Sequence, residues 1–520
     1  MLKKTIDQIV PETAERLPDK TALIFGEKTF TYRQLERLTN QTANGLKTLG
    51  VKKDDRVTLF AQNSAEWVLS YIGIAKAGAV INPVNAMLTA DELAYVVKDC
   101  GAKVLITTSE RAKTALHLKQ DGSLTEIVVL SGAPIEGTIS FGGLLAGQAD
   151  TVETPANAPE DLSTICYTSG TTGFPKGAML SHHSVVLNAA MTAAMNVRTE
   201  HDVQFTGLPL AHVYGTVVMN LSFLLGLTFV MLEKFDTQQA LESIQRNKVT
   251  IMDGVPTMYL YMLSYPDFGK YDLSSLRTAV VGGQAMPAAK TTEWLERVGT
   301  PILELWGMTE LAGVGIMQHS YCDNRLGSVG IPMPFMQGRI ADPADPSKTL
   351  PPGEVGELMV KGPYTMLGYY GNEKATADAI EPDGWLHSGD LCKMDADGYF
   401  YIVDRKKDMI LTAGYNIYPA EIERVIVGHP AVAMVGVGPK PDSHKGEIAK
   451  AYIVLKAGAS ADAAGIVDYC RKHLAAYKVP REVQFVPALP TTSSGKIMRR
   501  ELKTLDLDAA DAKQTAAAAV

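Results

Sequence analysis

The stretch that most constrains the fold of this chain is a glycine-rich segment, Tyr167-Thr-Ser-Gly-Thr-Thr-Gly-Phe-Pro-Lys-Gly177. Glycines let backbone amides approach a ligand closely, hydroxyls add hydrogen-bond donors, and Lys176 adds a mobile positive charge. These are the groups that enclose a polyphosphate. The spacing matches neither the Walker loop nor the Gly-x-Gly-x-x-Gly dinucleotide pattern. The segment therefore predicts a phosphate loop of another kind.

The residues on either side predict that this segment joins two strands. Residues 162–167 are β-branched and aromatic, and residues 177–180 are apolar and extended. Ser181 is a good N-cap, and a helical pattern begins there. An ordinary hairpin turn is the alternative, although turns rarely need eleven residues with a central Pro-Lys. We expect the loop to close over a nucleotide.

Length and composition indicate a large multidomain protein. A chain of 520 residues is too long for one core, and a net charge of −8 argues against nonspecific nucleic-acid binding. Five scattered cysteines favour a reducing compartment with free thiols. The start of the chain has no apolar signal-peptide core, and the longest apolar run, 221–232, is too short to span a bilayer. We expect a cytoplasmic protein with no integral membrane segment and no nucleic-acid partner.

Strand-like runs alternate with helical runs over most of the length, which predicts an α/β fold. Helices are expected at 65–79 and 92–100, the second with Gly101 as its C-cap. From 325 to 401 the chain is rich in glycine and proline and predicts a β-rich, barrel-like subdomain. A compact α+β pattern follows. The expected organisation is an N-terminal domain at 1–403, a hinge at 404–408, a small mobile C-terminal domain at 409–505 and a tail at 506–520.

Polar clusters recur where strand patterns end, which is where α/β folds bind ligands. The backbone around Gly283 and Gln284 could face a flat base. Trp306 could stack on a ring, Thr309 could donate to a phosphate, and Glu310 could hold a magnesium ion. The alternative for this second cluster is a buried tryptophan followed by an N-capping threonine.

Further along the chain, Asp390 and Arg405 could bind the hydroxyls of one ribose, although a Gly-Asp turn and a solvated linker are the plainer interpretations. Lys496, in a flexible loop of the small domain, could swing into a nucleotide site, or could be an ordinary exposed lysine. His212 with Tyr214 could border an apolar pocket, although a lone histidine is more often structural.

Taken together, the kinds and order of these motifs resemble the adenylate-forming superfamily, which contains acyl-CoA synthetases, peptide-synthetase adenylation domains and firefly luciferase. YTSGTTGFPKG resembles the phosphate-loop signature of that family, and WGMTE resembles its adenine segment with Trp306 in place of tyrosine. GWLHSGD, YIVDRKKDMI and PTTSSGKIMRR resemble the remaining core motifs in the expected order. The resemblance covers nearly the whole chain.

The resemblance implies a ligase that uses ATP, Mg²⁺ and coenzyme A. A carboxylate would attack the α-phosphorus of ATP to give an acyl-adenylate and pyrophosphate, and a thiol would then displace AMP. The implied β- and γ-phosphate site comprises Thr168, Ser169, Gly170, Thr171, Thr172, Gly173 and Lys176. Thr309 and Glu310 would hold the α-phosphate and magnesium, while Gly283, Gln284, Trp306 and Gly307 would frame adenine, and Asp390 and Arg405 would hold the ribose.

The same resemblance implies that Lys496 bridges the carboxylate and the α-phosphate, that Lys407 is the hinge, and that Gly414 lines a tunnel for pantetheine. The implied acyl pocket comprises His212, Tyr214, Gly215, Ala312 and Gly313. Its small and apolar residues suggest a deep channel, so a medium- or long-chain fatty acid is the favoured substrate. An aryl acid of the 4-coumarate or ferulate type is the alternative, and a noncatalytic nucleotide-binding protein is a distant one. The expected partners are the acid, ATP and coenzyme A, with a homodimer left open.

Overall fold

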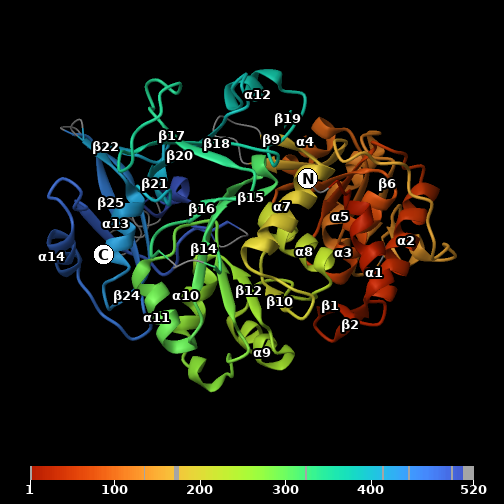
Figure 1. Cartoon of the computed structure of the whole chain (residues 1–520), viewed down its shortest axis with the longest axis horizontal. Helices are drawn as coiled ribbons and strands as arrows, with labels where there is room; N and C mark the ends of the chain where they lie inside the picture. The colour runs from red at the N-terminus through yellow and green to blue at the C-terminus, as the bar shows by residue number, and fades with distance from the viewer. Residues whose placement is uncertain are drawn as a thin grey trace, which may run out of the picture.

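The computed structural model describes residues 3–133, 135–168, 175–321, 325–412, 415–442, 445–492 and 496–506. Within them, two large sheets share most of the chain (Figure 1). One sheet has, in spatial order, β16 (Ile331–Pro332), β15 (Gly313–Met317), β14 (Ile302–Met308), β13 (Thr278–Val281), β12 (Ile251–Gly254), β10 (Val203–Thr206), β11 (Thr228–Met231), β1 (Thr21–Phe25) and β2 (Lys28–Thr31). The other has β19 (Gly368–Tyr369), β9 (Lys176–Ser181), β8 (Leu162–Thr168), β4 (Val80–Pro83), β3 (Arg56–Phe60), β5 (Ala102–Thr107), β6 (Glu126–Val129) and β7 (Ile139–Ser140).

Two smaller sheets complete the mixed α/β fold. The glycine-rich segment forms a four-stranded antiparallel sheet of β17 (Gln337–Ala341), β18 (Gly356–Lys361), β20 (Leu386–Met394) and β21 (Phe400–Arg405). The small C-terminal domain, blue in Figure 1, is built on β23 (Tyr415–Ile417), β22 (Ile410–Thr412), β25 (Gly446–Leu455), β24 (Val432–Asp442) and β26 (Glu482–Phe485).

Helices join and cover these sheets. The α-helices are α1 (Ile9–Arg16), α2 (Tyr32–Thr48), α3 (Ala65–Lys76), α4 (Ala90–Cys100), α5 (Ser109–Gln120), α6 (Phe141–Leu145), α7 (His182–Met195), α8 (Val213–Leu225), α9 (Thr237–Asn247), α10 (Pro256–Ser264), α11 (Ala288–Val298), α12 (Glu373–Ala379), α13 (Pro419–Ile426) and α14 (Ala463–His473). Four 3₁₀ turns lie at η1 (Ile6–Gln8), η2 (Phe268–Lys270), η3 (Thr309–Leu311) and η4 (Arg499–Glu501). In the described part of the chain, no helix is both long and apolar enough to cross a bilayer.

The local signals in the sequence predict several element boundaries correctly. Ser181 caps α7 by accepting a hydrogen bond from the Ser184 amide, and Gly101 ends α4 in the left-handed conformation, at φ +59°. The predicted helix 65–79 is shorter in the structure, because α3 ends at Lys76 and Gly78, at φ +78°, turns the chain toward the next strand. α4 begins two residues earlier than predicted, at a capping box formed by Thr89 and Glu92.

The four described cysteines, Cys100, Cys166, Cys392 and Cys470, are free and buried, as expected, while Cys322 lies outside the described residues. Burial raises the pKa of the Cys100 thiol to about 11 and that of Cys166 to about 12. These thiols are therefore uncharged apolar packing groups at neutral pH.

Strand order determines where the polar clusters lie. β12, β13 and β14 are parallel neighbours, so their carboxyl ends meet at one edge of the nine-stranded sheet. Val281 pairs with Glu304, so the residues after β13, including Gly283 and Gln284, follow the strand toward the carboxyl end of β14. Helices α7 and α8 pack against each other and against β15, which places His212 at the same end of the fold. The fold thus brings three segments, distant in sequence, to one site.

Candidate active site

The two strands predicted around the phosphate loop are present. β8 and β9 pair antiparallel, with Thr168 opposite Lys176, and the Thr168 hydroxyl donates to the Lys176 carbonyl at 3.4 Å. The predicted loop residues Ser169, Gly170, Thr171, Thr172 and Gly173 lie outside the described residues. The structure thus supports the strand–loop–strand connection and places Lys176 at the start of β9.

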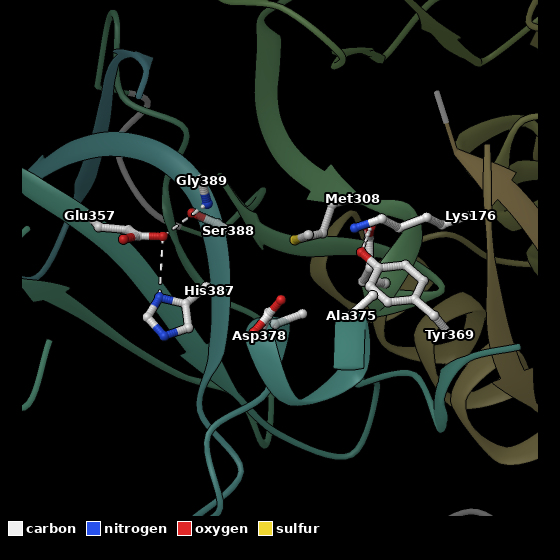
Figure 2. Close-up of a pocket in the computed structure, with 11 residues that line it drawn as sticks. Lys176, Met308, Glu357, Tyr369, Ala375, Asp378, His387, Ser388 and Gly389 are labelled. Atoms are coloured by element: carbon white, nitrogen blue, oxygen red, sulfur yellow. Dashed lines mark hydrogen bonds and ion pairs between the residues drawn. The ribbon is translucent and has the colours of Figure 1, made fainter. Parts of the chain in front are cut away.

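A cavity of about 250 Å³ opens beside Lys176 (Figure 2). Glu310, Tyr369 and the segment 387–389 also line it. The Lys176 Nζ atom lies 5.2 Å from the centroid of the Tyr369 ring, and the Tyr369 hydroxyl donates to Glu310 Oε1 at 2.7 Å. One cation and one carboxylate are therefore brought together by a shared tyrosine, an arrangement suited to a phosphate chain and its counter-ion.

Tyr369 is a site residue that sequence reasoning missed. It lies in β19, a two-residue strand that pairs with β9 and so reaches the loop lysine. Burial, and then the Glu310 charge, raise the pKa of the Tyr369 hydroxyl, so it stays protonated at neutral pH and donates a hydrogen bond to the carboxylate. An aromatic pair in a glycine-rich stretch, Gly368-Tyr-Tyr-Gly371, is the only local signal that marks it.

Glu310 is suited to hold a divalent cation together with phosphate oxygens. Its side chain is buried in the η3 turn, faces the cavity and is oriented by Tyr369. Among the described residues, no group of three or more His, Cys, Asp and Glu side chains could hold a metal alone. A single carboxylate matches Mg²⁺, which is bound by one or two carboxylates with substrate phosphates and water. The residues present thus fit magnesium bound with a nucleotide.

A second set of polar contacts joins Trp306, Asp390 and Arg405. The Trp306 Nε1 atom donates to Asp390 Oδ2 at 2.7 Å, while Arg405 Nε lies 3.5 Å from Asp390 Oδ1. Asp390 and Arg405 are direct partners in the β20–β21 ladder. The indole N–H of Trp306 therefore holds the Asp390 carboxylate, a contact that the sequence did not predict. Stacking of Trp306 on adenine stays a prediction.

The predicted adenine segments surround this carboxylate. Gly307 is exposed next to Trp306, and Gly283 is exposed at φ +87°, beside the half-buried Gln284. The left-handed φ at Gly283 would strain any residue with a side chain, so the turn after β13 depends on glycine. Thr309, in the η3 turn, is half-buried and follows Met308 at the end of β14. These groups share one edge of the sheet.

Lys496 enters this site from the small domain. Its amide donates to the Thr492 hydroxyl at 3.1 Å, and its carbonyl accepts from the Thr492 amide at 2.8 Å, so the backbone of Lys496 is held by Thr492. Desolvation, and then the positive charge of Arg405, lower the pKa of Lys496 to about 7, while Asp390 acts in the opposite direction. Lys496 therefore lies among the charges that surround the predicted ribose site.

Two further predicted site residues, Lys407 and Gly414, differ in whether the structure describes them. Lys407 is exposed in the turn after β21, and desolvation followed by the Arg405 charge lowers its pKa. Its hinge role stays a prediction. Gly414, expected to line the pantetheine tunnel, lies outside the described residues.

The lowered pKa of Lys496 predicts unusual reactivity toward amine-modifying reagents. A lysine with a pKa near 7 is protonated and unreactive below that pH, and neutral and nucleophilic above it. Trace acetylation followed by mass spectrometry should give a half-maximal labelling rate for Lys496 near pH 7. The same residue in urea-unfolded protein should titrate about three units higher, near the ordinary value of 10.5. A midpoint above pH 9 in the native protein would contradict this environment.

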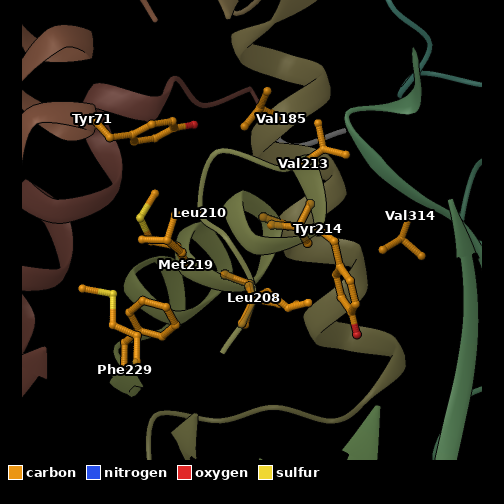
Figure 3. Close-up of a cluster of buried hydrophobic side chains, with 14 of the residues drawn as sticks. Tyr71, Val185, Leu208, Leu210, Val213, Tyr214, Met219, Phe229 and Val314 are labelled. Atoms are coloured by element: carbon orange, nitrogen blue, oxygen red, sulfur yellow. The ribbon is translucent and has the colours of Figure 1, made fainter. Parts of the chain in front are cut away.

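Three of the predicted acyl-pocket residues, His212, Tyr214 and Gly215, lie at the start of α8, and Figure 3 shows Tyr214 there. His212 is the N-cap of that helix, and its Nδ1 atom accepts from the Tyr214 amide at 3.2 Å. His212 is exposed as a residue, but protein atoms crowd its imidazole. This desolvation, and then the charge of Lys496, lower the pKa of the imidazole to about 4. His212 is therefore neutral at physiological pH and close to Lys496.

Tyr214, two residues after His212, is held in place by a buried hydrogen bond. Its hydroxyl donates to Asp253 Oδ1 at 3.0 Å, and Asp253 is paired with Arg198 at 2.8 Å, with both charged side chains fully buried. Gln204 also donates to Asp253, at 2.8 Å. A Cβ atom at Gly282 would lie 3.2 Å from the Tyr214 ring, so the ring packs directly on the turn after β13. The Tyr214 ring is therefore fixed in position beside the predicted acyl pocket.

The small residues of this region pack closely against neighbouring segments. A Cβ atom at Gly215 would lie 2.3 Å from the Pro209 carbonyl oxygen, and one at Gly313 would lie 2.4 Å from Val217 Cγ2. Ala312 is buried in the left-handed conformation, at φ +55°. At Gly215 and Gly313 the absent side chain lets α8 approach its neighbours, so the small size of these two residues is explained by packing.

Comparisons with known proteins agree with this geometry. Residues 10–370 match the AMP-binding enzyme family, and residues 421–496 match the AMP-binding enzyme C-terminal domain. The chain is 37% identical over 496 residues to a feruloyl-CoA synthase of Amycolatopsis sp, covering 94% of this chain and 96% of that protein. It is 35% identical over 528 residues to a long-chain-fatty-acid–CoA ligase of Bacillus subtilis strain 168, covering 96% and 94%. Its fold matches the crystal structure of the anthranilate CoA ligase AuaEII in complex with anthranoyl-AMP, with a TM-score of 0.92 and 33% identity, covering 98% and 99%.

Proposed function

The chain belongs to the AMP-binding enzyme family as an AMP-forming acid–CoA ligase, and from this premise we propose roles for its residues and a class of acid. In the first reaction, a carboxylate oxygen of the acid attacks the α-phosphorus of ATP, and pyrophosphate leaves. In the second, the coenzyme A sulfur attacks the acyl carbon, the thiol proton is lost, and AMP leaves. The observation that carries the assignment of roles is the gathering of Asp390, Arg405 and Lys496 around one point.

ATP would lie along the edge where β13 and β14 end, beside Asp390 of β20. Lys176 and the loop before it would hold the β- and γ-phosphates, because a cation beside a cavity neutralises their charge. Asp390 would accept from the ribose hydroxyls, oriented by the Trp306 ring edge. Arg405, 3.5 Å from the same carboxylate, would hold the ribose from its other side.

Lys496 would bring the two anions of the first step together. The acid carboxylate and the α-phosphate repel each other, and a compact ammonium group between them offsets that repulsion as the new bond forms. The neutral His212 nearby adds no competing positive charge. Thr309, beside Glu310 in the η3 turn, would donate to the α-phosphate.

Magnesium fits the carboxylate of Glu310. When bound there with the nucleotide, it supplies neutralisation of phosphate charge. The Tyr369 hydroxyl orients this carboxylate by donating a hydrogen bond to it.

The second step needs coenzyme A to reach the acyl carbon. We propose that Lys407 is the hinge about which the small domain turns, and that Gly414 lines the path of the thiol. A cytoplasmic location and a homodimer likewise stay predictions of the sequence.

We propose a compact aromatic or arylpropenoyl acid as the substrate. The acid carboxylate must lie near Lys496 and His212, so the body of the acid extends toward Tyr214, two residues further along α8. Asp253 holds the Tyr214 ring in place, and α8 approaches β15 closely at Gly313. A flat acid fits against a fixed ring. The relatives named for ferulate and anthranilate support this choice.

A medium- or long-chain fatty acid is the second candidate. It was the favoured substrate on the sequence alone, and the relative named for long-chain fatty acids has almost the same identity as the feruloyl-CoA synthase. The apolar cluster in and around α8, which includes Leu208, Leu210 and Met219 (Figure 3), offers a lining for such a chain if Tyr214 moves aside.

Acid-dependent exchange of pyrophosphate into ATP, measured over a panel of acids, tests the proposal. We expect ferulate, 4-coumarate, benzoate or anthranilate to give a kcat/KM at least about 10-fold above octanoate and palmitate, because a misfit of a few methylenes costs this much. Tyr214→Ala should shift the preference toward the longer acids by about 10-fold. Tyr214→Phe keeps the ring and loses only the hydroxyl, which donates to Asp253 and to the Val280 carbonyl, so it should retain the preference of the parent.

A parent enzyme that prefers palmitate to every aryl acid would overturn the proposed substrate class and leave the ligase assignment intact. An unchanged acid preference in Tyr214→Ala would contradict the role of this ring as a wall of the pocket.

A further inference from the structure

Arg499 lies at the centre of an acidic cluster drawn from three segments of the chain. Its guanidinium contacts Glu423 of α13 through two nitrogens, at 3.0 and 2.6 Å, Asp404 of β21 at 2.6 Å, and Asp408 at 3.3 Å. The side chain of Asp404 is 1% exposed, and that of Arg499 is 15% exposed. A planar guanidinium suits such a cluster, because its donors point in fixed directions and bind carboxylates in pairs.

Asp404 joins the two domains with both of its carboxylate oxygens. Oδ1 accepts from Arg499, and Oδ2 accepts from the Ala420 amide at 2.7 Å, at the first turn of α13. β21, which carries Asp404, belongs to the sheet of β17, β18 and β20. α13 and η4, which carry Ala420 and Arg499, pack against β24 of the small domain. The carboxylate therefore bonds to two groups across the domain boundary and favours this orientation of the small domain.

This contact lies very close in sequence to both halves of the catalytic site. Arg499 is three residues after Lys496, and Asp404 immediately precedes Arg405, which faces Asp390. Asp404 Oδ1 also accepts from the Arg405 amide at 2.7 Å, so the same carboxylate orders the backbone of Arg405. A shift at Asp404 would therefore be passed on to Lys496 and to Arg405.

We propose that Asp404 and Arg499 are positioning residues for adenylation: their buried ion pair holds the small domain in the orientation that places Lys496 beside Asp390 and Arg405. The inference rests on the proposed role of Lys496. Because the pair crosses the domain boundary, any turn of the small domain about the segment 405–408 must break it. The pair thus favours the first half-reaction over the second.

Glu423 makes the inference testable without unfolding the small domain. In Asp404→Asn, Arg499 keeps its two contacts with Glu423, and the new amide oxygen can still accept from Ala420. We expect the kcat for pyrophosphate exchange to fall by about 10- to 100-fold, since a misplacement of about 1 Å has such an effect. Transfer from a chemically supplied acyl-adenylate to coenzyme A should stay within about threefold of the parent.

A readout that does not need activity comes from trypsin, which cleaves after Arg405, Lys406 and Lys407. Loosening the domains should speed cleavage of this segment several-fold in Asp404→Asn. The matched control is Glu421→Gln on the same helix, which breaks the 2.7 Å ion pair with Lys478 inside the small domain. It should leave cleavage and both half-reactions unchanged.

Parallel loss of both half-reactions in Asp404→Asn, or no change in exchange and cleavage, would overturn the proposal. If the parent shows no exchange with any acid, the proposed function fails, and the cleavage rates still report on the ion pair. Asp404→Glu keeps the charge and should recover part of the exchange activity.

Discussion

Replacing Lys496 with alanine is expected to lower the rate of adenylation by about 10²- to 10³-fold, the effect of removing one well-placed electrostatic stabiliser. The ammonium group lies among Asp390, Arg405 and Arg499, where burial keeps water from screening its charge. Without it, the charge that offsets the repulsion between the acid and the α-phosphate at this point is lost. Acid-dependent pyrophosphate exchange measures this step directly.

The second half-reaction separates a catalytic role from damage to the fold. Transfer from a supplied acyl-adenylate involves no attack on phosphorus, so Lys496→Ala should carry it out within a few-fold of the parent rate. Lys472→Ala, at an exposed lysine of α14, is the control for loss of charge on the small domain. Equal loss of both half-reactions would count against the assigned role of Lys496.

The largest expected effect on stability comes from Asp253→Ala. Asp253 and Arg198 are paired at 2.8 Å with both side chains fully buried, and Tyr214 and Gln204 donate to the same carboxylate. Removing the carboxylate leaves a buried guanidinium without its counter-charge, which costs about 3–5 kcal/mol of unfolding free energy. This is a large part of the stability of a typical domain, about 5–15 kcal/mol. Urea unfolding followed by tryptophan fluorescence measures the loss.

The double variant Arg198→Met with Asp253→Leu is the matched control. It removes both charges and fills the space with apolar side chains, so it should recover most of the stability lost in Asp253→Ala. Because the double variant keeps the Tyr214 ring, its acid preference should stay close to that of the parent, as expected for Tyr214→Phe. An Asp253→Ala protein within about 1 kcal/mol of the parent would mean that water reaches Arg198.

Local chemistry made much of this fold predictable from the sequence. Ser181 begins α7 and Gly101 ends α4 because caps depend on the torsions and side chains of a few neighbouring residues. β8 and β9 flank the phosphate loop because strand-forming residues bound a long turn that is rich in glycine. The order of the polar motifs along the chain identified the family before any distance was known. Helix ends such as that of α3 were less certain, because apolar residues continue past the last turn.

The partners of the site residues depend on tertiary structure. Tyr369 reaches Lys176 and Glu310 only because β19 pairs with β9, and Trp306 reaches Asp390 across 84 positions of sequence. Arg499 meets Asp404 across 95 positions. Periodicity and spacing describe neighbours along the chain, whereas such contacts follow from strand order and domain packing.

The predicted acyl pocket shows most directly what the sequence determined and what the tertiary structure decided. The sequence by itself determined that small and apolar residues follow His212 and Glu310, and that the chain carries the motifs of a carboxylate-activating ligase. Only the tertiary structure decided that Gly215 and Gly313 are filled by neighbouring atoms and that Tyr214 is held by Asp253. The physical reason is that a missing side chain can make room for a ligand or for the protein itself. The packing of α8 against β15 decides between the two.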